Sequence, residues 1–238
     1  MTAPQRPPYF VRRSLARLTR LLTPRRDSRE RQETRHARVG PVHLWQMKRD
    51  FQRNFLLRAG LAPHHRLLDL GCGTLRGGIP LIAYLEPGHY TGIETRDDVL
   101  AEARLELREA ALENRHPTLL HCTDLSQLSL PTLFDFIWCF SVLIHMEDAI
   151  TADALAFAAR QLGDAGVFLA NVNAGIAPER GWQGFPVVTR PLGFYAGLAA
   201  RAGLQMTPLG TLRELGHVSG NASADAQIML RFARVQAG

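Results

Sequence analysis

Three carboxylates in this sequence lie in or directly after short apolar runs, and in that position they could bind a small ligand. Asp69 lies within the first of these runs, and Glu94 and Asp124 stand at the ends of the next two. Apolar runs of this length, separated by helix-like segments, predict buried parallel strands. Ligands of such sheets bind beyond the carboxyl ends of the strands. We therefore expect the three acids to meet at one edge of a sheet.

The first acid stands two residues before a pair of glycines, in a segment that reads Arg-Leu-Leu-Asp-Leu-Gly-Cys-Gly-Thr-Leu-Arg-Gly-Gly from residue 66 to 78. Gly71 and Gly73 can adopt backbone angles that other residues resist, and they have no side chain to hold a ligand away. A helix expected over 79–85 would direct its free N–H groups at the same ligand. The segment predicts a ligand-binding turn between a strand and a helix.

The spacing of the glycines bears on the identity of the ligand. A dinucleotide pattern, Gly-x-Gly-x-x-Gly, needs a third glycine where this chain has Arg76. A carboxylate just before a phosphate-binding turn would repel the pyrophosphate, so Asp69 favours a cationic ligand. The run Asp-Leu-Gly-Cys-Gly-Thr resembles the first motif of the class I S-adenosylmethionine-dependent methyltransferases, whose cofactor carries an ammonium and a sulfonium group. The ordinary alternative is a structural turn that binds nothing.

The resemblance implies S-adenosylmethionine as cofactor, with the glycine turn carrying its methionine part. Glu94 would accept hydrogen bonds from both ribose hydroxyls, because two carboxylate oxygens match a vicinal diol. An acid in this place also binds the ribose of NAD, so Glu94 alone does not separate the two cofactors. Asp124 and the N–H of Leu125 would bind the adenine. The expected cofactor contacts are Asp69, Gly71, Cys72, Gly73, Thr74, Glu94, Asp124, Leu125, Phe140 and Ser141. Each acid, taken alone, could instead cap a helix or lie in a solvated loop.

The order of the predicted elements indicates the α/β class. Strands are expected over 67–70, 89–94, 119–123, 134–140, 166–172, 204–209 and 227–232. Apolar strands that alternate with helices predict a parallel sheet covered on both faces. The resemblance implies a Rossmann-like, doubly wound, seven-stranded sheet that is mostly parallel, with the last strand antiparallel. It covers 65–172 firmly and the last two strands loosely, and the wider sequence looks like one bacterial subfamily without an assigned substrate.

We expect two regions, a basic and partly helical N-terminal extension over 1–40 and a methyltransferase domain over 41–238. The extension holds eleven arginines against three acids. Its residues 11–22 form a basic amphipathic pattern that could lie on an anionic membrane, contact a partner or dock on its own domain. Residues 25–38 read as a charged linker. The domain would begin with a lid helix over 42–59 and carry a substrate-loop insertion over 173–190.

Composition narrows the classes of protein further. Because the positive charge lies in the extension, a nucleic-acid-binding catalytic face is not indicated. No apolar run approaches the roughly 20 residues that span a bilayer, and no segment resembles a secretory signal. The three cysteines lack metal-ligand spacing and read as buried thiols. We expect a cytoplasmic protein, peripheral to the inner membrane surface if 11–22 binds lipid.

The implied reaction is displacement at a sulfonium methyl group, which mainly requires an aligned acceptor and the exclusion of water. A hydroxyl or ammonium acceptor must also lose a proton, which requires a base near neutrality. His145, just past the fourth strand, is the first candidate, and His217 is a weaker one. Histidines in such places are also often structural. No acid occurs in 140–146, where metal-dependent catechol-type enzymes place their ligands, so we expect a metal-independent enzyme.

The acceptor pocket is expected between the lid helix and the insertion. An aromatic pair with an amide and a guanidinium would suit a sugar or a small anionic metabolite. The candidate residues are Trp45, Arg49, Trp182, Gln183, Phe185, Arg190 and His217. Ordinary packing of a helix and a surface loop is the alternative for all of them.

The sequence therefore predicts a methyltransferase that acts on a small-molecule or glycan-precursor acceptor, with oxygen as the expected acceptor atom. Two alternatives stay open. One is an S-adenosylmethionine-binding partner or sensor module without turnover. The other is a nicotinamide-dependent oxidoreductase, which would bind NADH and not S-adenosylmethionine. The acceptor, the oligomeric state and the role of the basic extension do not follow from the sequence.

Overall fold

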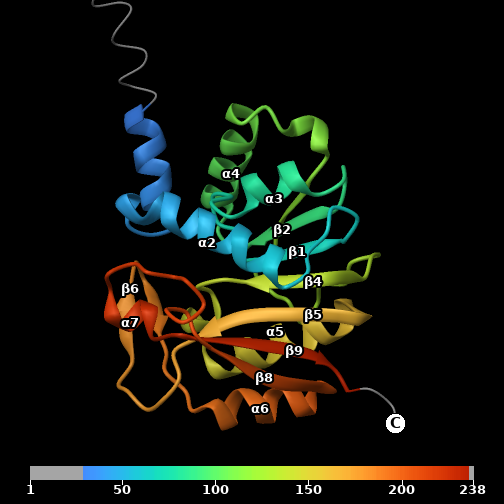
Figure 1. Cartoon of the computed structure of the whole chain (residues 1–238), viewed down its shortest axis with the longest axis vertical. Coiled ribbons are helices and arrows are strands. Elements are labelled where there is room, and N and C mark those ends of the chain that lie inside the picture. The colour runs from blue at the N-terminus through green and yellow to red at the C-terminus, as the bar shows by residue number, and fades with distance from the viewer. Residues whose placement is uncertain (1–28, 236–238) are drawn as a thin grey trace, which may run out of the picture.

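The computed structural model describes residues 29–235, and its centre is a seven-stranded sheet (Figure 1). The strand order is β3-β2-β1-β4-β5-β9-β8. The strands are β1 (Leu67–Leu70), β2 (Tyr90–Glu94), β3 (Thr118–His121), β4 (Phe134–Cys139), β5 (Leu162–Val172), β8 (Leu204–Thr211) and β9 (Ile228–Arg234). Strand β9 is antiparallel to both of its neighbours, and the other pairs are parallel. The predicted Rossmann-like fold with an antiparallel last strand is confirmed.

Helices cover both faces of the sheet because the strands are apolar on both sides. The helices are α2 (Trp45–Arg58), α3 (Gly78–Tyr84), α4 (Asp97–Glu109), α5 (Asp148–Gln161) and α6 (Leu192–Arg201), with the single-turn helices η1 (Val42–Leu44), η2 (Glu113–Arg115), η3 (Leu143–His145) and the short α7 (Ala222–Asp225). Within β4, Trp138 packs in the layer with α2, α3 and α4, whereas Ile137 packs in the layer with α5 and α6. Each layer buries its own apolar cluster.

The chain reverses direction across the sheet at β1. It runs outward through β2 and β3, then returns to place β4 on the other side of β1. Connections leave the carboxyl ends of β1 and β4 in opposite directions at this point, which opens a crevice in doubly wound sheets. The glycine turn follows β1 and the segment 141–146 follows β4, so the two border this crevice.

The predicted charged linker is wrong for its described part, because residues 29–37 form a helix. Arg35 of this helix is only 3% exposed. Its guanidinium donates to three carboxylates of α4, those of Glu102, Glu106 and Glu109, at 2.6–3.0 Å. The next residue, His36, stacks on Trp45 with ring centroids 3.3 Å apart. The many charges of 25–38 predicted a solvent-exposed segment. Arg35 is buried because the glutamates that neutralise it lie in α4, about 70 residues further along the chain.

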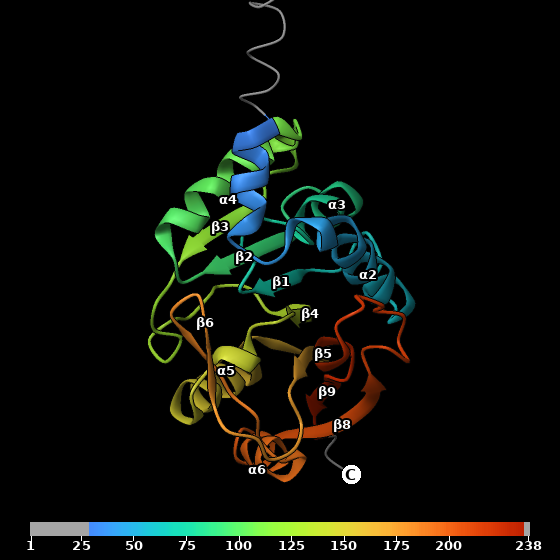
Figure 2. The ribbon, with the colours of Figure 1, turned by 90° about the vertical axis from the view of Figure 1, so that its left-hand side faces the viewer.

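The predicted insertion loop contains a hairpin, β6 (Arg180–Trp182) paired with β7 (Phe185–Val187). Its two turn residues, Gln183 and Gly184, both have positive φ, as in the tight turns that suit the twist of hairpins. The Gln183 amide donates to the carbonyl of Ala37 at 3.3 Å. Figure 2 looks onto the edge of the molecule where the hairpin and the helix over 29–37 both lie.

The predicted amphipathic helix over 11–22 lies outside the described residues. Within residues 29–235, no helix combines the length and the apolar character needed to cross a bilayer.

Arg35→Ala should lower the free energy of unfolding by about 3 kcal/mol, because Glu106 would stay buried without its cation. Urea denaturation measures the change. Arg31→Ala removes an exposed arginine from the same helix and should change stability by less than about 0.5 kcal/mol. Equal losses in the two variants would contradict a buried anchoring role for Arg35.

Candidate active site

A cavity of about 390 Å³ lies beyond the carboxyl ends of β1, β2 and β4. The segment after β4 forms its floor, and the glycine turn forms one wall. Val39, Trp182 and Phe185, from the N-terminal segment and the hairpin, also line it. The side chains of Asp69, Glu94 and Asp124 all belong to this lining. The sequence expectation that the three acids meet at one edge of the sheet therefore agrees with the geometry.

The glycine turn approaches two other segments too closely for any side chain. Gly71 and Gly73 have φ of +80° and +56°. A Cβ on Gly71 would lie 2.4 Å from Val142, and one on Gly73 would lie 2.8 Å from Val39. The N–H groups of Gly71 and Cys72 both donate to the carbonyl of Ile93, at 2.8 and 2.9 Å. Glycine is needed here to let the turn lie flat against β2 and form one wall of the cavity.

Asp69 is a buried acid that points toward the second strand. The Tyr90 hydroxyl donates to its carboxylate at 2.6 Å. Burial raises the pKa of Asp69 to about 7, although the Tyr90 hydrogen bond and Arg76 act in the opposite direction. A nearby cation would favour the ionised form and bring the pKa down. The site is thus arranged to gain from a positively charged ligand.

Arg76 is a cavity residue that sequence reasoning missed. Its side chain is buried, its Nη1 donates to the carbonyl of Val39 at 2.8 Å, and its guanidinium lies 5.9 Å from the ring centroid of Trp45. Among residues 29–235, nothing accepts a hydrogen bond from its Nε. Burial lowers the pKa of Arg76 to about 10. The only sequence signal was an arginine at the position where a dinucleotide fold needs glycine.

Glu94 is held by backbone donors on both carboxylate oxygens. The N–H of Gly73 donates to Oε2 at 3.1 Å, and the N–H of Arg96 donates to Oε1 at 3.0 Å. The Arg96 guanidinium also pairs with Oε1 at 3.3 Å and lies 5.4 Å from the ring centroid of Phe185. Each carboxylate oxygen has more than one lone pair, so Glu94 can still accept from a ligand diol.

Asp124 follows β3 in a more exposed position. The backbone N–H and the hydroxyl of Ser126 both donate to its Oδ1, at 2.9 and 2.6 Å. These bonds, the hydroxyl first, lower the pKa of Asp124. The carboxylate therefore stays ionised and oriented by its own turn. Cys122 and Leu125 line the cavity beside it.

His145 lies in η3 and lines the cavity. Its Nδ1 is 2.8 Å from the carbonyl of Pro186, and because a carbonyl only accepts, Nδ1 must carry the proton. The neutral ring then has an unprotonated Nε2, as a general base requires. The ring stacks on Trp182 with centroids 5.2 Å apart. Burial, more than the nearby Arg96, lowers the pKa of His145 below the ordinary histidine value.

Several residues expected at the acceptor do not line the cavity. Trp45 is buried under His36 and Arg76. Arg190 pairs with Asp148 and Glu179, at 2.8 Å each, so its charge is already balanced. Arg49 also lies outside the lining, and the Gln183 amide is directed to Ala37. The predicted acceptor role of these four residues is therefore corrected. For Trp45, Arg190 and Gln183 the reason is that the side chain already contacts residues distant in sequence.

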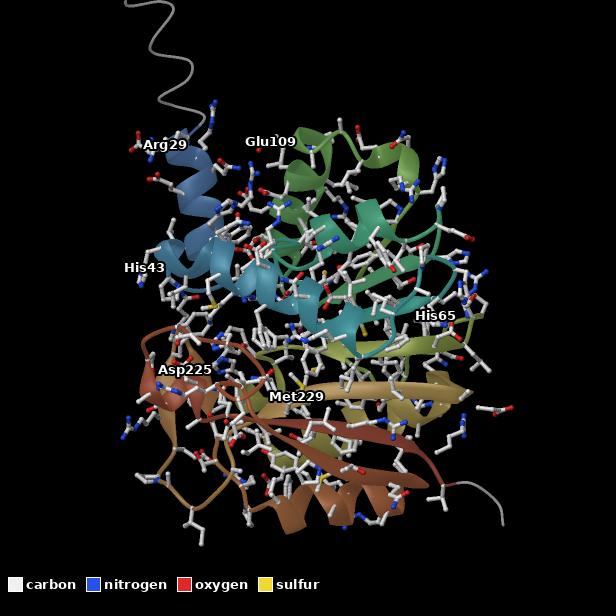
Figure 3. All side chains as sticks on the ribbon, viewed as in Figure 1. Arg29, His43, His65, Glu109, Asp225 and Met229 are labelled. Atoms are coloured by element: carbon white, nitrogen blue, oxygen red, sulfur yellow. The ribbon has the colours of Figure 1, made fainter. Side chains whose placement is uncertain are left out.

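His217 and Thr74 also lie outside the cavity lining. His217 is buried beside Phe140, and its Nδ1 is 2.9 Å from the carboxylate of Asp225. Burial lowers its pKa in spite of that acid. Figure 3 shows Asp225 in α7 and, for comparison, Met229 in strand β9 of the sheet. Thr74 is fully buried, and its hydroxyl has no hydrogen-bond partner among residues 29–235.

The structure adds cavity residues that were not among the predicted site residues. They come from the end of β1, from the glycine turn, from the segments after β2, β3 and β4, from α2 and from α5. Those not already described are Gln52, Leu70, Gly77, Thr95, Thr123, Met146, Ile150 and Asp153. Apart from Leu70 and Gly77, no local motif marks them, because each reaches the cavity only through the tertiary arrangement.

Comparison with known proteins gives a family match for the central part of the chain. The family described as a methyltransferase domain matches residues 68–168, which span β1 to β5. No curated protein sequence matches the chain.

Solved structures share the fold at low sequence identity. The magnesium protoporphyrin IX methyltransferase of Synechocystis PCC 6803, with bound S-adenosylmethionine, is 18% identical, with a TM-score of 0.59 over 80% of this chain and 79% of that one. The CcbJ methyltransferase of Streptomyces caelestis is 14% identical, with a TM-score of 0.60 over 79% and 90%. The glycopeptide N-methyltransferase MtfA is 19% identical, with a TM-score of 0.60 over 79% and 90%. At these identities the likeness shows the Rossmann-like methyltransferase fold.

Residues 68–168 therefore match a methyltransferase domain, and the described part of the chain has the Rossmann-like fold of S-adenosylmethionine-dependent methyltransferases. Two of the similar structures, those of the magnesium protoporphyrin IX methyltransferase and of MtfA, contain bound S-adenosylhomocysteine.

Asp69 should make stability depend on pH in a predictable direction. Because its folded pKa is raised to about 7, its contribution is fully present below about pH 4 and is lost as the pH rises through 7. Asp69→Asn cannot ionise and should escape this loss. Between pH 4 and 8 the variant should gain on the order of 3 kcal/mol over the wild type in urea unfolding. A constant difference across this range would contradict the raised pKa.

Proposed function

We propose that the cavity binds S-adenosylmethionine and that the enzyme transfers the methyl group to oxygen of a small-molecule or glycan-precursor acceptor, without a metal ion. The observation that carries the proposal is the meeting of Asp69, Glu94 and Asp124 in one cavity over a glycine turn. These acids lie in or after three adjacent strands, so they can contact successive parts of one extended ligand. Their charge suits a ligand that carries a sulfonium and an ammonium group.

Each part of the cofactor has a chemically matched group in this arrangement. Glu94 would hold the ribose diol, and Asp124 with the N–H of Leu125 would hold the adenine. Gly71 and Gly73 would let the methionine part lie against the turn, with Cys72 behind them. Arg76, buried and with an unused donor at Nε, fits the amino-acid carboxylate. Phe140 and Ser141 would contact the cofactor from the floor of the cavity.

The residues of this chain would align the acceptor and keep water out. When bound, S-adenosylmethionine supplies a methyl group already activated by its sulfonium. Val39, Trp182 and Phe185 would cover the cavity, which limits access of water. His145 would take the proton from an acceptor hydroxyl through Nε2, while the Pro186 carbonyl holds Nδ1–H in place. This neutral form is available at physiological pH because the pKa of His145 is lowered.

The aromatic side chains near His145 favour an acceptor with a flat or apolar face. Trp182 and Phe185 offer such surfaces, as in sites that bind sugar rings. Arg190 is paired with two acids, so its guanidinium is not available to bind an anionic metabolite. The fold itself does not set the acceptor, because the similar structures include a magnesium protoporphyrin IX methyltransferase and a glycopeptide N-methyltransferase.

Glu94→Gln should weaken S-adenosylhomocysteine binding at least about tenfold, because an amide would direct N–H groups at N–H donors and lose ribose contacts. Calorimetric titration measures the affinity, with NADH as a parallel ligand that should not bind. Glu86→Gln, at an exposed site before β2, is the matched control and should bind as the wild type does. Unchanged affinity in Glu94→Gln would remove the ribose assignment.

His145→Ala should slow methyl transfer by about 10²–10⁴-fold once an acceptor is found by screening, because the general base is lost. Affinity for S-adenosylhomocysteine should change by less than about threefold. In the wild type, the rate should fall with decreasing pH only below the ordinary histidine range, because burial lowers the pKa of His145. His64→Ala, exposed before β1, is the control. Full activity in His145→Ala would exclude it as the base.

A further inference from the structure

A chain of side-chain amides runs through the interior beside the cavity. The N–H of Ser141 donates to Oδ1 of Asn171 at 2.6 Å, and Nδ2 of Asn171 donates to Oε1 of Gln227 at 2.6 Å. Nε2 of Gln227 then donates to Oδ1 of Asn173 at 3.0 Å, and Nδ2 of Asn173 donates to the carbonyl of Val188 at 2.9 Å. Four successive hydrogen bonds therefore connect Ser141, just after β4, to Val188, just after the hairpin.

The direction of every bond in this chain is fixed. Ser141 contributes a backbone N–H, which can only donate, and Val188 contributes a carbonyl, which can only accept. Each amide between them must therefore accept on one side and donate on the other. Amide dipoles aligned in this way polarise one another and strengthen the series. An acceptor placed where a donor is needed would interrupt it.

Burial makes the chain costly to break. Asn171 is fully buried and Gln227 is 9% exposed. A buried donor or acceptor left without a partner costs about 1–3 kcal/mol. Ser141, at one end, has φ of +60°, a conformation that is unfavourable for a residue with a side chain. The hydrogen bond to Asn171 helps hold this residue in its strained position on the floor of the cavity.

The chain closes on the segment from which it starts. The N–H of Val188 donates to the carbonyl of Ile144 at 2.9 Å. Pro186, two residues before Val188, accepts from His145. The amide chain thus binds the start of 141–146 at Ser141, and Val188, at the other end of the chain, binds the same segment at Ile144. This segment carries four cavity-lining residues, Ser141, Val142, His145 and Met146.

We propose that Asn171, Gln227 and Asn173 are positioning residues for methyl transfer. They contact neither cofactor nor acceptor, and they set the backbone of 141–146 so that Ser141 meets the cofactor and His145 meets the acceptor. The inference rests on the proposed function of the cavity. None of these three residues lines the cavity, so sequence and cavity shape alone would have left them as ordinary packing.

Gln227→Glu tests the direction of the chain with almost no change in shape. A protonated glutamic acid accepts from Asn171 through its carbonyl oxygen and donates to Asn173 through its O–H, so both bonds survive. An ionised carboxylate can only accept, and the bond to Asn173 is lost. Burial should raise the pKa of the new carboxyl above its ordinary range, because Gln227 is only 9% exposed. The variant should therefore behave as the wild type in acid and be impaired in base.

Two measurements report the outcome as ratios of variant to wild type at each pH. Hydrogen exchange of the backbone amides of 141–146 requires no cofactor, and it should be at least about tenfold faster in the variant at pH 8.5 and equal at pH 5. Calorimetric affinity for S-adenosylhomocysteine should be about tenfold weaker at pH 8.5 and equal at pH 5. The titration of Asp69, His145, His217 and Asp225 affects both proteins and cancels in the ratio.

Two further variants keep the test decisive. Gln161→Glu is the control, because it makes the same change at another buried amide. The Oε1 of Gln161 accepts from the N–H of Leu130, and a carboxylate can keep this bond. Both ratios should therefore stay near one. Gln227→Met removes both bonds and should be impaired at every pH, which decides the matter if the glutamate variant does not fold in base. Ratios near one at every pH for both Gln227 variants would overturn the proposal. Absent cofactor binding in the wild type would refute the cavity assignment and leave the exchange result interpretable.

Discussion

The contact between the glycine turn and the end of β2 is the constraint on which the site depends. The Ile93 carbonyl accepts two N–H groups of the turn, and the Glu94 carboxylate accepts a third from Gly73. These three hydrogen bonds hold the glycine turn in place and also orient the Glu94 carboxylate. It also demands glycine, because Val142 and Val39 occupy the space that side chains would need. Loss of the contact would therefore disturb the floor, one wall and the cover of the cavity together.

The cavity contains two buried charged side chains, Asp69 and Arg76, that do not form an ion pair with each other. Asp69 and Arg76 are both buried, and each has its pKa moved toward the neutral form. Neither forms an ion pair with the other in the structure, since Asp69 bonds to Tyr90 and Arg76 to the carbonyl of Val39. A zwitterionic ligand could compensate both charges at once. The protein thus holds two groups in a costly state that binding would relieve.

The sequence predicts those parts of the structure that local pattern determines. Apolar strands, the glycine turn and the acids at strand ends follow from periodicity and residue chemistry, and the structure has them in the expected order. Arg35 and Arg190 could not be interpreted in this way, because the acids that neutralise them lie in distant segments. The hairpin turn has Gln183-Gly184 in place of the usual Asn-Gly, so the sequence does not predict a hairpin there. Tertiary partners decided the role of each of these side chains.

The helix over 29–37 changes where the catalytic unit begins. Composition places a boundary near residue 41, but Val39 covers the glycine turn, its carbonyl binds Arg76, and Arg35 anchors the helix to α4. A fragment that starts at residue 41 would expose Glu106 without its cation and open the cavity to solvent. Residues 29–40 therefore belong to the folded domain, and truncation experiments on the basic extension should keep every residue from 29 onward.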